Sequence, residues 1–195
     1  MTENEFQRVY GSPGEDARSD RIAARLRESA SGRALEAATG LGSFHGGFLS
    51  VGSLREEVAL GRWARWLPDG AFLYASSALG FLYIGVEELM WLVNTQTGSI
   101  LPTDYQLDEA VLKAASLSTR EDLLDLPLFD RWLAVNTRLA ATEMLAPEKP
   151  LIHGGEMQVE QLVRRPMADY LRETADLFED DGPNAISIMD PDDES

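Results

Sequence analysis

Residues 71–102, AFLYASSALGFLYIGVEELMWLVNTQTGSILP, decide the fold of this chain. The stretch holds four short apolar runs, AFLYAS, GFLYIGV, ELMWLVN and GSILP, which Leu-Gly, Val-Glu-Glu and Thr-Gln-Thr-Gly signals separate. Runs of this length, rich in aromatic and branched residues and divided by turn signals, are typical of β-strands. Gly98 supplies the positive φ that the turn after Asn94 requires. The stretch therefore predicts an antiparallel meander.

Helical patterns flank this meander on both sides. Ser53 followed by Glu56 forms a capping box at the start of one of them. We expect helices at residues 17–30, 53–68, 108–116, 127–145, 156–163 and 166–178, and a further strand with a flexible Gly46-Gly47 joint at residues 44–51. Strands in the middle with helices at both ends indicate an α+β fold, and not alternating βαβ units. We predict a central antiparallel meander of three to five strands with helices at both ends.

The 195 residues fit one domain, which we place at residues 17–178. Residues 1–16 are polar and carry several glycine and proline breakers, so we expect a flexible N-terminus. Residues 179–195 carry seven acidic residues and no basic one, and acidic tails of this kind usually stay solvated. We therefore expect a flexible acidic tail.

The chain has 33 acidic and 17 basic residues, which gives a formal net charge of −16. The first 33 residues contain six of each sign, so the net charge belongs to residues 34–195, which have 27 acidic and 11 basic residues. This charge argues against direct binding to nucleic acid and against docking on an anionic membrane. It suits a basic partner, because opposite fields speed encounter, and it equally suits simple solubility. Composition alone favours solubility, but the position of the charge in residues 34–195 leaves the two interpretations evenly weighed.

The sequence shows no signal peptide, no membrane span and no cysteine, and these features bear on where the protein is located and which chemistry it can carry out. The start shows no apolar segment behind a basic one, so no signal peptide is visible. The longest apolar run, residues 71–86, is shorter than the ~20 residues that a membrane helix needs. The chain contains no cysteine, which excludes disulfides, thiolate metal sites and a cysteine nucleophile. We expect a cytoplasmic protein.

The two histidines, His45 and His153, are each followed by two glycines. A His-Gly-Gly segment is similar to the oxyanion loop of lipases, but the chain has no G-x-S-x-G elbow to supply the nucleophile. A metal site needs ligands at suitable spacing. His153 and Glu156 are separated by the Gly-Gly break, and His45 has no acid near it in the sequence. We predict no catalytic residue, no metal, no cofactor and no enzymatic activity.

Two pairs of carboxylates and four tryptophans remain open to more than one interpretation. The pairs Glu87/Glu88 and Asp122/Asp125 could serve acid–base chemistry, although adjacent acids on turns and helix faces are more often solvated charge. The tryptophans occupy apolar positions, so we expect most of them in the core and allow that one is an interface anchor. They are Trp63, Trp66, Trp91 and Trp132.

Three segments, residues 46–68, 74–100 and 149–178, carry a resemblance to a known family. Their order, a Gly-Gly strand before a helix, then the meander, then a Gly-Gly loop before the last helices, resembles the core of bacterial type VI secretion immunity proteins of the DNase-toxin immunity type. The chain is also similar in style to the broader SUKH immunity superfamily. It departs from the pattern at Gly80-Phe81, where an acid is usual, and at Ile152-His153, where an aromatic is usual.

The resemblance implies a SUKH-like α+β domain and a non-catalytic function. It implies an immunity protein that binds a cognate, type VI effector-like toxin and blocks it sterically and electrostatically. The net charge of −16 favours a basic nuclease as that toxin. The acids that we expect to contact the partner are Glu87, Glu88, Asp104, Asp108 and Glu109. The alternative is a SUKH-like adaptor or regulatory module that binds another protein.

Overall fold

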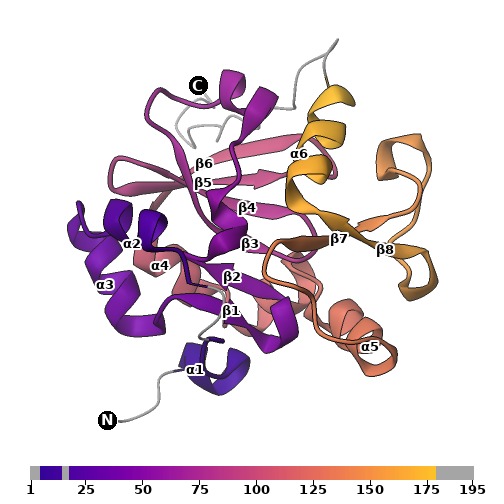
Figure 1. Ribbon diagram of the computed structural model, residues 1–195, viewed down its shortest axis with the longest axis horizontal. Coiled ribbons are helices and arrows are strands. Elements are labelled where there is room, and N and C mark those ends of the chain that lie inside the picture. The colour runs from indigo at the N-terminus through magenta and orange to yellow at the C-terminus, as the bar shows by residue number, and fades with distance from the viewer. Residues whose placement is uncertain (1–4, 15–17, 179–195) are drawn as a thin grey trace, which may run out of the picture.

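A computed structural model of the protein describes residues 5–14 and 18–178 and has an α+β fold (Figure 1). Six strands form one antiparallel sheet, and their order in the sheet is their order in the chain. They are β1 (Gly42–Phe44), β2 (Leu49–Val51), β3 (Phe72–Ser77), β4 (Phe81–Val86), β5 (Leu89–Asn94) and β6 (Ser99–Gln106). A separate antiparallel pair consists of β7 (Glu143–Pro147) and β8 (Leu162–Pro166). The predicted fold class and meander are confirmed.

The sheet has six strands, one more than the upper end of the predicted range, because residues 44–51 fold back on themselves. The predicted single strand is a hairpin in which the 3-10 turn η2 (His45–Gly47) joins β1 to β2. His45 has φ 46° and Gly47 has φ 99°. A Cβ atom at Gly47 would lie 2.7 Å from Cβ of Leu139. The glycine is needed both for its backbone conformation and for this close approach.

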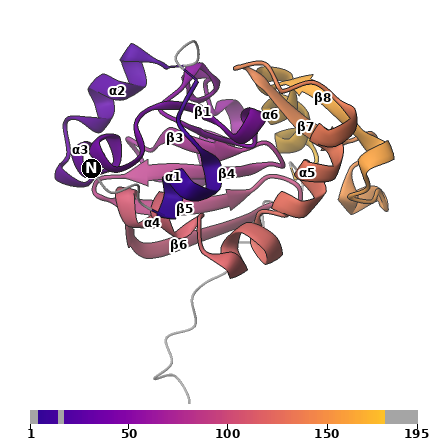
Figure 2. The same ribbon diagram turned by 90° about the horizontal axis from the view of Figure 1, so that it is seen from below.

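Helices stand at both ends of the sheet, as Figures 1 and 2 show. The N-terminal helices α2 and α3 lie at one end, and α5, α6 and the β7–β8 pair lie at the other. The α-helices are α1 (Glu5–Tyr10), α2 (Asp20–Leu26), α3 (Ala30–Thr39), α4 (Leu107–Lys113), α5 (Leu126–Val135) and α6 (Met167–Asp176). The other turns are the 3-10 helices η3 (Leu54–Glu57), η4 (Gly61–Trp66), η6 (Leu151–His153) and η7 (Val159–Gln161), and the π-helix η5 (Thr119–Leu123). No helix in the described part of the chain is long and apolar enough to cross a membrane.

The hydrophobic core is divided by the sheet. Successive side chains of a strand point to opposite faces, and in β4 Tyr83 belongs to one apolar cluster while Leu82 and Ile84 belong to another. The first cluster joins the sheet to α1–α5, and the second joins it to η4, β7 and α6. Trp63 and Trp132 are buried, one in each cluster. Trp66 and Trp91 are partly buried against the second cluster, in agreement with the expected core positions.

The N-terminal segment packs on the body of the protein. Phe6 is 1% exposed, Tyr10 is 2% exposed, and the Tyr10 hydroxyl donates to the carbonyl oxygen of Ala114 at 2.5 Å. The prediction of a flexible N-terminus over residues 1–16 is therefore wrong for residues 5–14, because two aromatic side chains at helical spacing (i, i+4) anchor α1 in the core. The predicted acidic tail, residues 179–195, lies outside the described residues.

Several predicted helices are shorter than expected. Residues 53–68 form only η3 and η4, because Gly61 adopts φ 58° at the start of η4, although the Ser53–Glu56 capping box is present. The helix predicted for residues 127–145 ends at Val135, and its last three residues belong to β7 instead.

At the C-terminal end, the helix predicted for residues 156–163 is wrong. Only Val159–Gln161 is helical, and the following residues pair with β7 as strand β8. The helix predicted for residues 166–178 is confirmed as α6. Pairing with β7 explains why the end of the segment 156–163 is a strand and not a helix, because tertiary context overrides weak local preferences in short segments.

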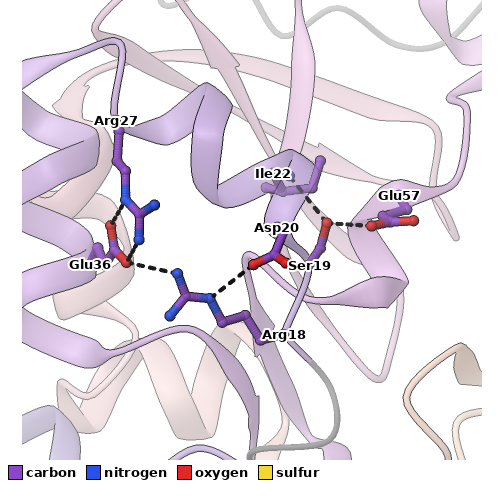
Figure 3. A network of polar contacts seen from close by, with 7 residues as sticks. All are labelled: Arg18, Ser19, Asp20, Ile22, Arg27, Glu36 and Glu57. Atoms are coloured by element: carbon purple, nitrogen blue, oxygen red, sulfur yellow. Dashed lines mark hydrogen bonds and ion pairs between the residues drawn. The ribbon is translucent and has the colours of Figure 1, made fainter.

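The helix predicted for residues 17–30 is α2, which Ser29 separates from α3 by capping the second helix. Glu36 of α3 accepts hydrogen bonds from Arg27 at 2.5 and 2.7 Å and from Arg18 at 3.3 Å (Figure 3). The hydrogen bond from Arg27 lowers the pKa of Glu36. Arg18 also lies 3.7 Å from Asp20. The charges of Arg18 and Arg27 are thus balanced by nearby acids, Asp20 and Glu36.

Candidate functional site

An apolar groove lies on the face of the sheet that α4 covers only in part. In β5, alternate residues Met90 and Leu92 line it, and Tyr83, Leu101 and Tyr105 of the neighbouring strands extend it. The other lining residues are Thr103, Ala110, Lys113, Ser116, Ser118, Thr119 and Leu123. The groove has a volume of about 440 Å³. We call this feature the groove.

Large apolar side chains at the groove are exposed to solvent. Leu123 is 41% exposed and Tyr105 is 38% exposed, and both line the groove. Leu117, which is 60% exposed, lies between the lining residues Ser116 and Ser118. Lys113 donates to the Tyr105 hydroxyl at 2.6 Å and lies 3.8 Å from the centre of the ring, which fixes one wall. Apolar surface gathered in a concave feature is typical of protein–protein contact sites.

A second hollow, which we call the acidic recess, adjoins the groove and shares Leu123 with it. It has a volume of about 340 Å³, and Asn94, the next alternate residue of β5, lines it. Its lining residues are Leu79, Phe81, Asn94, Gln96, Glu121, Asp122, Leu123, Leu124, Asp125, Leu151 and Met157. Three of these residues are acidic, and none is lysine or arginine. Met90 and Asn94 are four residues apart in an extended strand, so groove and recess follow one another over about 13 Å.

The three acids of the recess differ in the hydrogen bonds and ion pairs that they form with the rest of the protein. Oδ1 of Asp125 accepts from the backbone N–H of Leu128 at 3.2 Å and caps α5. The Glu121 carboxylate lies 3.8 Å from Nε of Arg120. Because both side chains are partly exposed to solvent, this ion pair contributes little to stability. Asp122 makes no hydrogen bond or ion pair with any residue that the structure describes. Asp122 is thus the carboxylate that is most available to a partner.

Two of the recess acids, Glu121 and Asp122, lie in the π-helix η5. Leu124 N–H donates to the carbonyl of Thr119 at 2.8 Å, a five-residue spacing. Ser118 and Glu121 have the spacing of a capping box but do not form one: Ser118 has helical angles and its side chain caps nothing. A single π turn is a rare conformation that is frequent at functional sites. Here it places Glu121, Asp122 and Leu123 where groove and recess meet.

The five acids predicted to bind the partner gather at one end of the sheet. Leu89 of β5 pairs with Gln106 of β6, so the β4–β5 turn lies beside the start of α4. Two of the five have structural roles. Glu88 accepts from the backbone N–H of Ala30 and from Ser31, which caps α3 and lowers the pKa of Glu88. Glu109 accepts from the backbone N–H of Gln106 at 3.2 Å and caps α4.

The other three predicted acids surround this end without entering the groove or the recess. Glu87 is exposed at the β4–β5 turn with φ 56°. Asp104 is exposed, and it does not line the groove although Thr103 and Tyr105 on either side do. Asp108 is half-buried, and its Oδ1 has no hydrogen-bond partner in the described part of the chain. The sequence indicates Asp122 and Asp125 as a pair of acids. Only their position in the fold shows that they line a recess and are not simply solvated surface charges.

The two histidines lie in different surroundings. Nε2 of His45 lies 2.6 Å from Oδ1 of Asp130 on α5, an acid that is distant in the sequence and that spacing therefore could not reveal. His153 is exposed in η6. Within residues 5–14 and 18–178, no three His, Asp or Glu side chains converge in a way that could hold a metal ion.

A buried polar cluster lies beneath η3, and the sequence indicates only its Ser53–Glu56 pair. Arg55 is 0% exposed and Glu56 is 2% exposed. The Glu56 carboxylate accepts from the Ser53 N–H and hydroxyl, both at 2.8 Å, from Ser50 at 3.0 Å and from Ser76 at 2.7 Å. Nη2 of Arg55 donates to the carbonyl of Gly47 at 2.8 Å, which ties η3 to the β1–β2 hairpin. The cluster lines neither the groove nor the recess, and it serves the fold.

Comparison with known proteins gives a likeness in fold alone. No protein-family model matches the chain, and no curated protein matches it. Among solved structures, the fold is similar to the crystal structure of Atu4351 from Agrobacterium tumefaciens, with a TM-score of 0.64 and 16% sequence identity. The similarity covers 89% of this chain and 88% of Atu4351. The two chains thus share an architecture over most of their length.

Proposed function

We propose that this chain is an immunity-type inhibitor, which binds a cognate basic protein toxin of the nuclease class and neutralises it by covering its surface. The observation that carries the proposal is the contiguity of the groove and the acidic recess along β5. An apolar centre with charged groups beside it is the usual anatomy of a specific protein interface.

The charge of the chain supports a basic partner. A nuclease carries positive charge where it holds the phosphate backbone. A chain with a net charge of −16 attracts such a surface, and acids beside the groove orient it. The resemblance of residues 44–178 to type VI secretion immunity proteins of the DNase-toxin type agrees with this partner class.

The direct test is co-expression of the full chain with the product of the adjacent gene. We expect this chain to restore growth to cells that produce the neighbouring toxin, and the two proteins to purify as a stable complex. If the neighbouring product is toxic and the chain neither binds it nor protects against it, the proposed function is wrong. Binding to a non-toxic neighbour would instead favour an adaptor.

Leu123 is the side chain whose loss should weaken this complex most selectively, because it lines both the groove and the recess. We expect Leu123→Ala to lower the affinity about 30-fold, the effect of truncating a central anchor. The matched control is Val135→Ala on α5, where the valine is 74% exposed and lines neither hollow. Titration calorimetry measures both variants, with thermal unfolding as a check on folding. If the two variants bind the toxin with equal affinity, the groove is not part of the interface.

The association rate should depend strongly on ionic strength. Raising the salt from about 50 to about 500 mM shortens the Debye length to a few ångströms, so long-range attraction between the two proteins is screened. We expect the on-rate to fall at least about tenfold while the chain remains folded. Stopped-flow mixing measures the rate, and circular dichroism reports folding. An on-rate that does not change with salt is incompatible with electrostatic steering.

A further inference from the structure

We infer that the groove is a binding site for a small amphiphilic anion, a free molecule with an apolar body and a carboxylate. The volume of the groove, about 440 Å³, lies within the range of about 300–1,000 Å³ that is typical of small-molecule sites. This ligand is a second use of the surface that the proposed function assigns to a toxin, and its binding can be measured without any toxin.

The strands contribute uncharged and mostly apolar side chains to the groove. Met90 and Leu92 of β5 line it beside Leu101 of β6. Tyr83 of β4 also lines it and is only 2% exposed. Burial raises the pKa of the Tyr83 hydroxyl, so the phenol stays neutral at physiological pH. This side of the groove therefore suits the apolar body of a ligand, as in most small-molecule sites.

The helical side of the groove supplies hydrogen-bond donors and one positive charge. Nζ of Lys113 on α4 donates to the Tyr105 hydroxyl at 2.6 Å, which uses one of the three donors of an ammonium. Lys113 is exposed and forms no ion pair with any residue that the structure describes. Oγ1 of Thr119 accepts from Ser116 at 2.8 Å, so its own O–H can donate to a ligand. A carboxylate is the group that such donors bind most strongly.

The charge in the groove is opposite in sign to the charge of the chain. Among the described residues that line the groove, Lys113 is the only charged one, although the chain has a net charge of −16. The acids of the recess do not line the groove. The overall field of the protein attracts cations and repels anions. Preferential binding of an anion in the groove is therefore evidence of local contacts, and not of the general field.

The experiment uses octanoate, octanol and octylammonium, which share one alkyl chain and differ in charge. Two-dimensional NMR of the full chain follows the methyl groups of Met90, Leu92 and Leu101, which line the groove and not the recess. We expect saturable shifts with octanoate, and affinities at least about fivefold lower for octanol and octylammonium, because neither offers Lys113 a carboxylate. The absence of saturable shifts with octanoate, or binding of either other probe as tight as that of octanoate, would overturn the inference.

Lys113 and Lys149, the two lysines of the chain, give a matched pair of variants. Lys113→Met keeps an apolar stem and removes the charge from the groove. Lys149→Met removes the same charge from an exposed position between β7 and η6, outside groove and recess. We expect Lys113→Met to weaken octanoate about tenfold and to change octanol less than twofold, and Lys149→Met to weaken octanoate less than twofold.

Circular dichroism checks that both variants are folded, and the same NMR titrations measure their affinities. A selective loss of octanoate binding in Lys113→Met supports the inferred site. If the two substitutions weaken octanoate equally, the anion responds only to the total charge of the chain, and the inference is wrong.

Discussion

Replacing Glu56 by alanine is expected to lower the free energy of unfolding by about 3–5 kcal/mol. The wild-type carboxylate collects four hydrogen bonds from Ser50, Ser53 and Ser76 in a site that excludes water. Alanine leaves these donors without their acceptor and removes the negative charge that interacts most strongly with the buried Arg55. Nε and Nη1 of Arg55 already lack a partner in the described part of the chain, so the cation has little to replace the loss. Denaturant unfolding measures the change.

Glu56→Gln is the control, since it keeps the shape and one accepting oxygen, and we expect it to cost only about 1–2 kcal/mol. If the glutamine and alanine variants lose the same stability, the hydrogen bonds to the carboxylate are not what holds η3 to the sheet.

Burial raises the pKa of Glu56, while Arg55 and the hydrogen bonds from the serines oppose that rise. A folded pKa above the unfolded value means that the folded protein binds this proton more tightly. The resulting stabilisation is complete below the ordinary pKa of about 4.3 and is lost as the pH rises through the raised value. The advantage of wild type over Glu56→Gln should therefore be largest at acidic pH and shrink toward neutrality.

Replacing Trp63 by alanine is expected to lower the free energy of unfolding by about 3–5 kcal/mol, the usual cost of removing a large buried aromatic side chain. Trp63 is 0% exposed, and its ring packs 5.4 Å from Trp66 and 5.9 Å from Phe178, measured between ring centres. Its Nε1 donates to the hydroxyl of Thr174 on α6 at 3.2 Å. The side chain thus joins η4 to the last helix of the described chain.

Two other substitutions separate the contributions to this effect. Trp63→Phe keeps most of the apolar volume and loses the hydrogen bond, and we expect a cost of about 1–2 kcal/mol. Trp66→Ala should cost less than Trp63→Ala, because Trp66 is only partly buried. Chemical unfolding compares the three variants. A larger loss for Trp66→Ala than for Trp63→Ala would mean that η4 packs through its other tryptophan.

The groove and the recess connect the fold to the proposed function. Alternation in β5 carries the apolar residues Met90 and Leu92 and the polar residue Asn94 to one face of the sheet. The opposite side chains, Trp91 and Val93, pack in the second core cluster. One strand therefore builds both the core and the site, so substitutions at Leu123 and Asp122, outside the strand, are the cleaner probes of binding.

The sequence determined the features that depend on local periodicity. The alternating runs at residues 71–102 predicted the meander, the Ser53–Glu56 spacing predicted its capping box, and the pattern at residues 166–178 predicted α6. In each case, neighbours along the chain supply the interactions that stabilise the conformation. The resemblance to immunity proteins and the negative charge also came from the sequence, and they define the proposed partner class.

Only the tertiary structure decided the features that depend on contacts between distant residues. The end of the predicted helix at residues 127–145 became β7 because β8 pairs with it, and Glu88 became a cap because α3 begins beside the β4–β5 turn. The residues of the candidate site differ from those predicted from the sequence for the same reason. Asp122 and Gln96 are 26 positions apart, and no local pattern relates them; packing η5 beside the end of β5 makes them two walls of one recess.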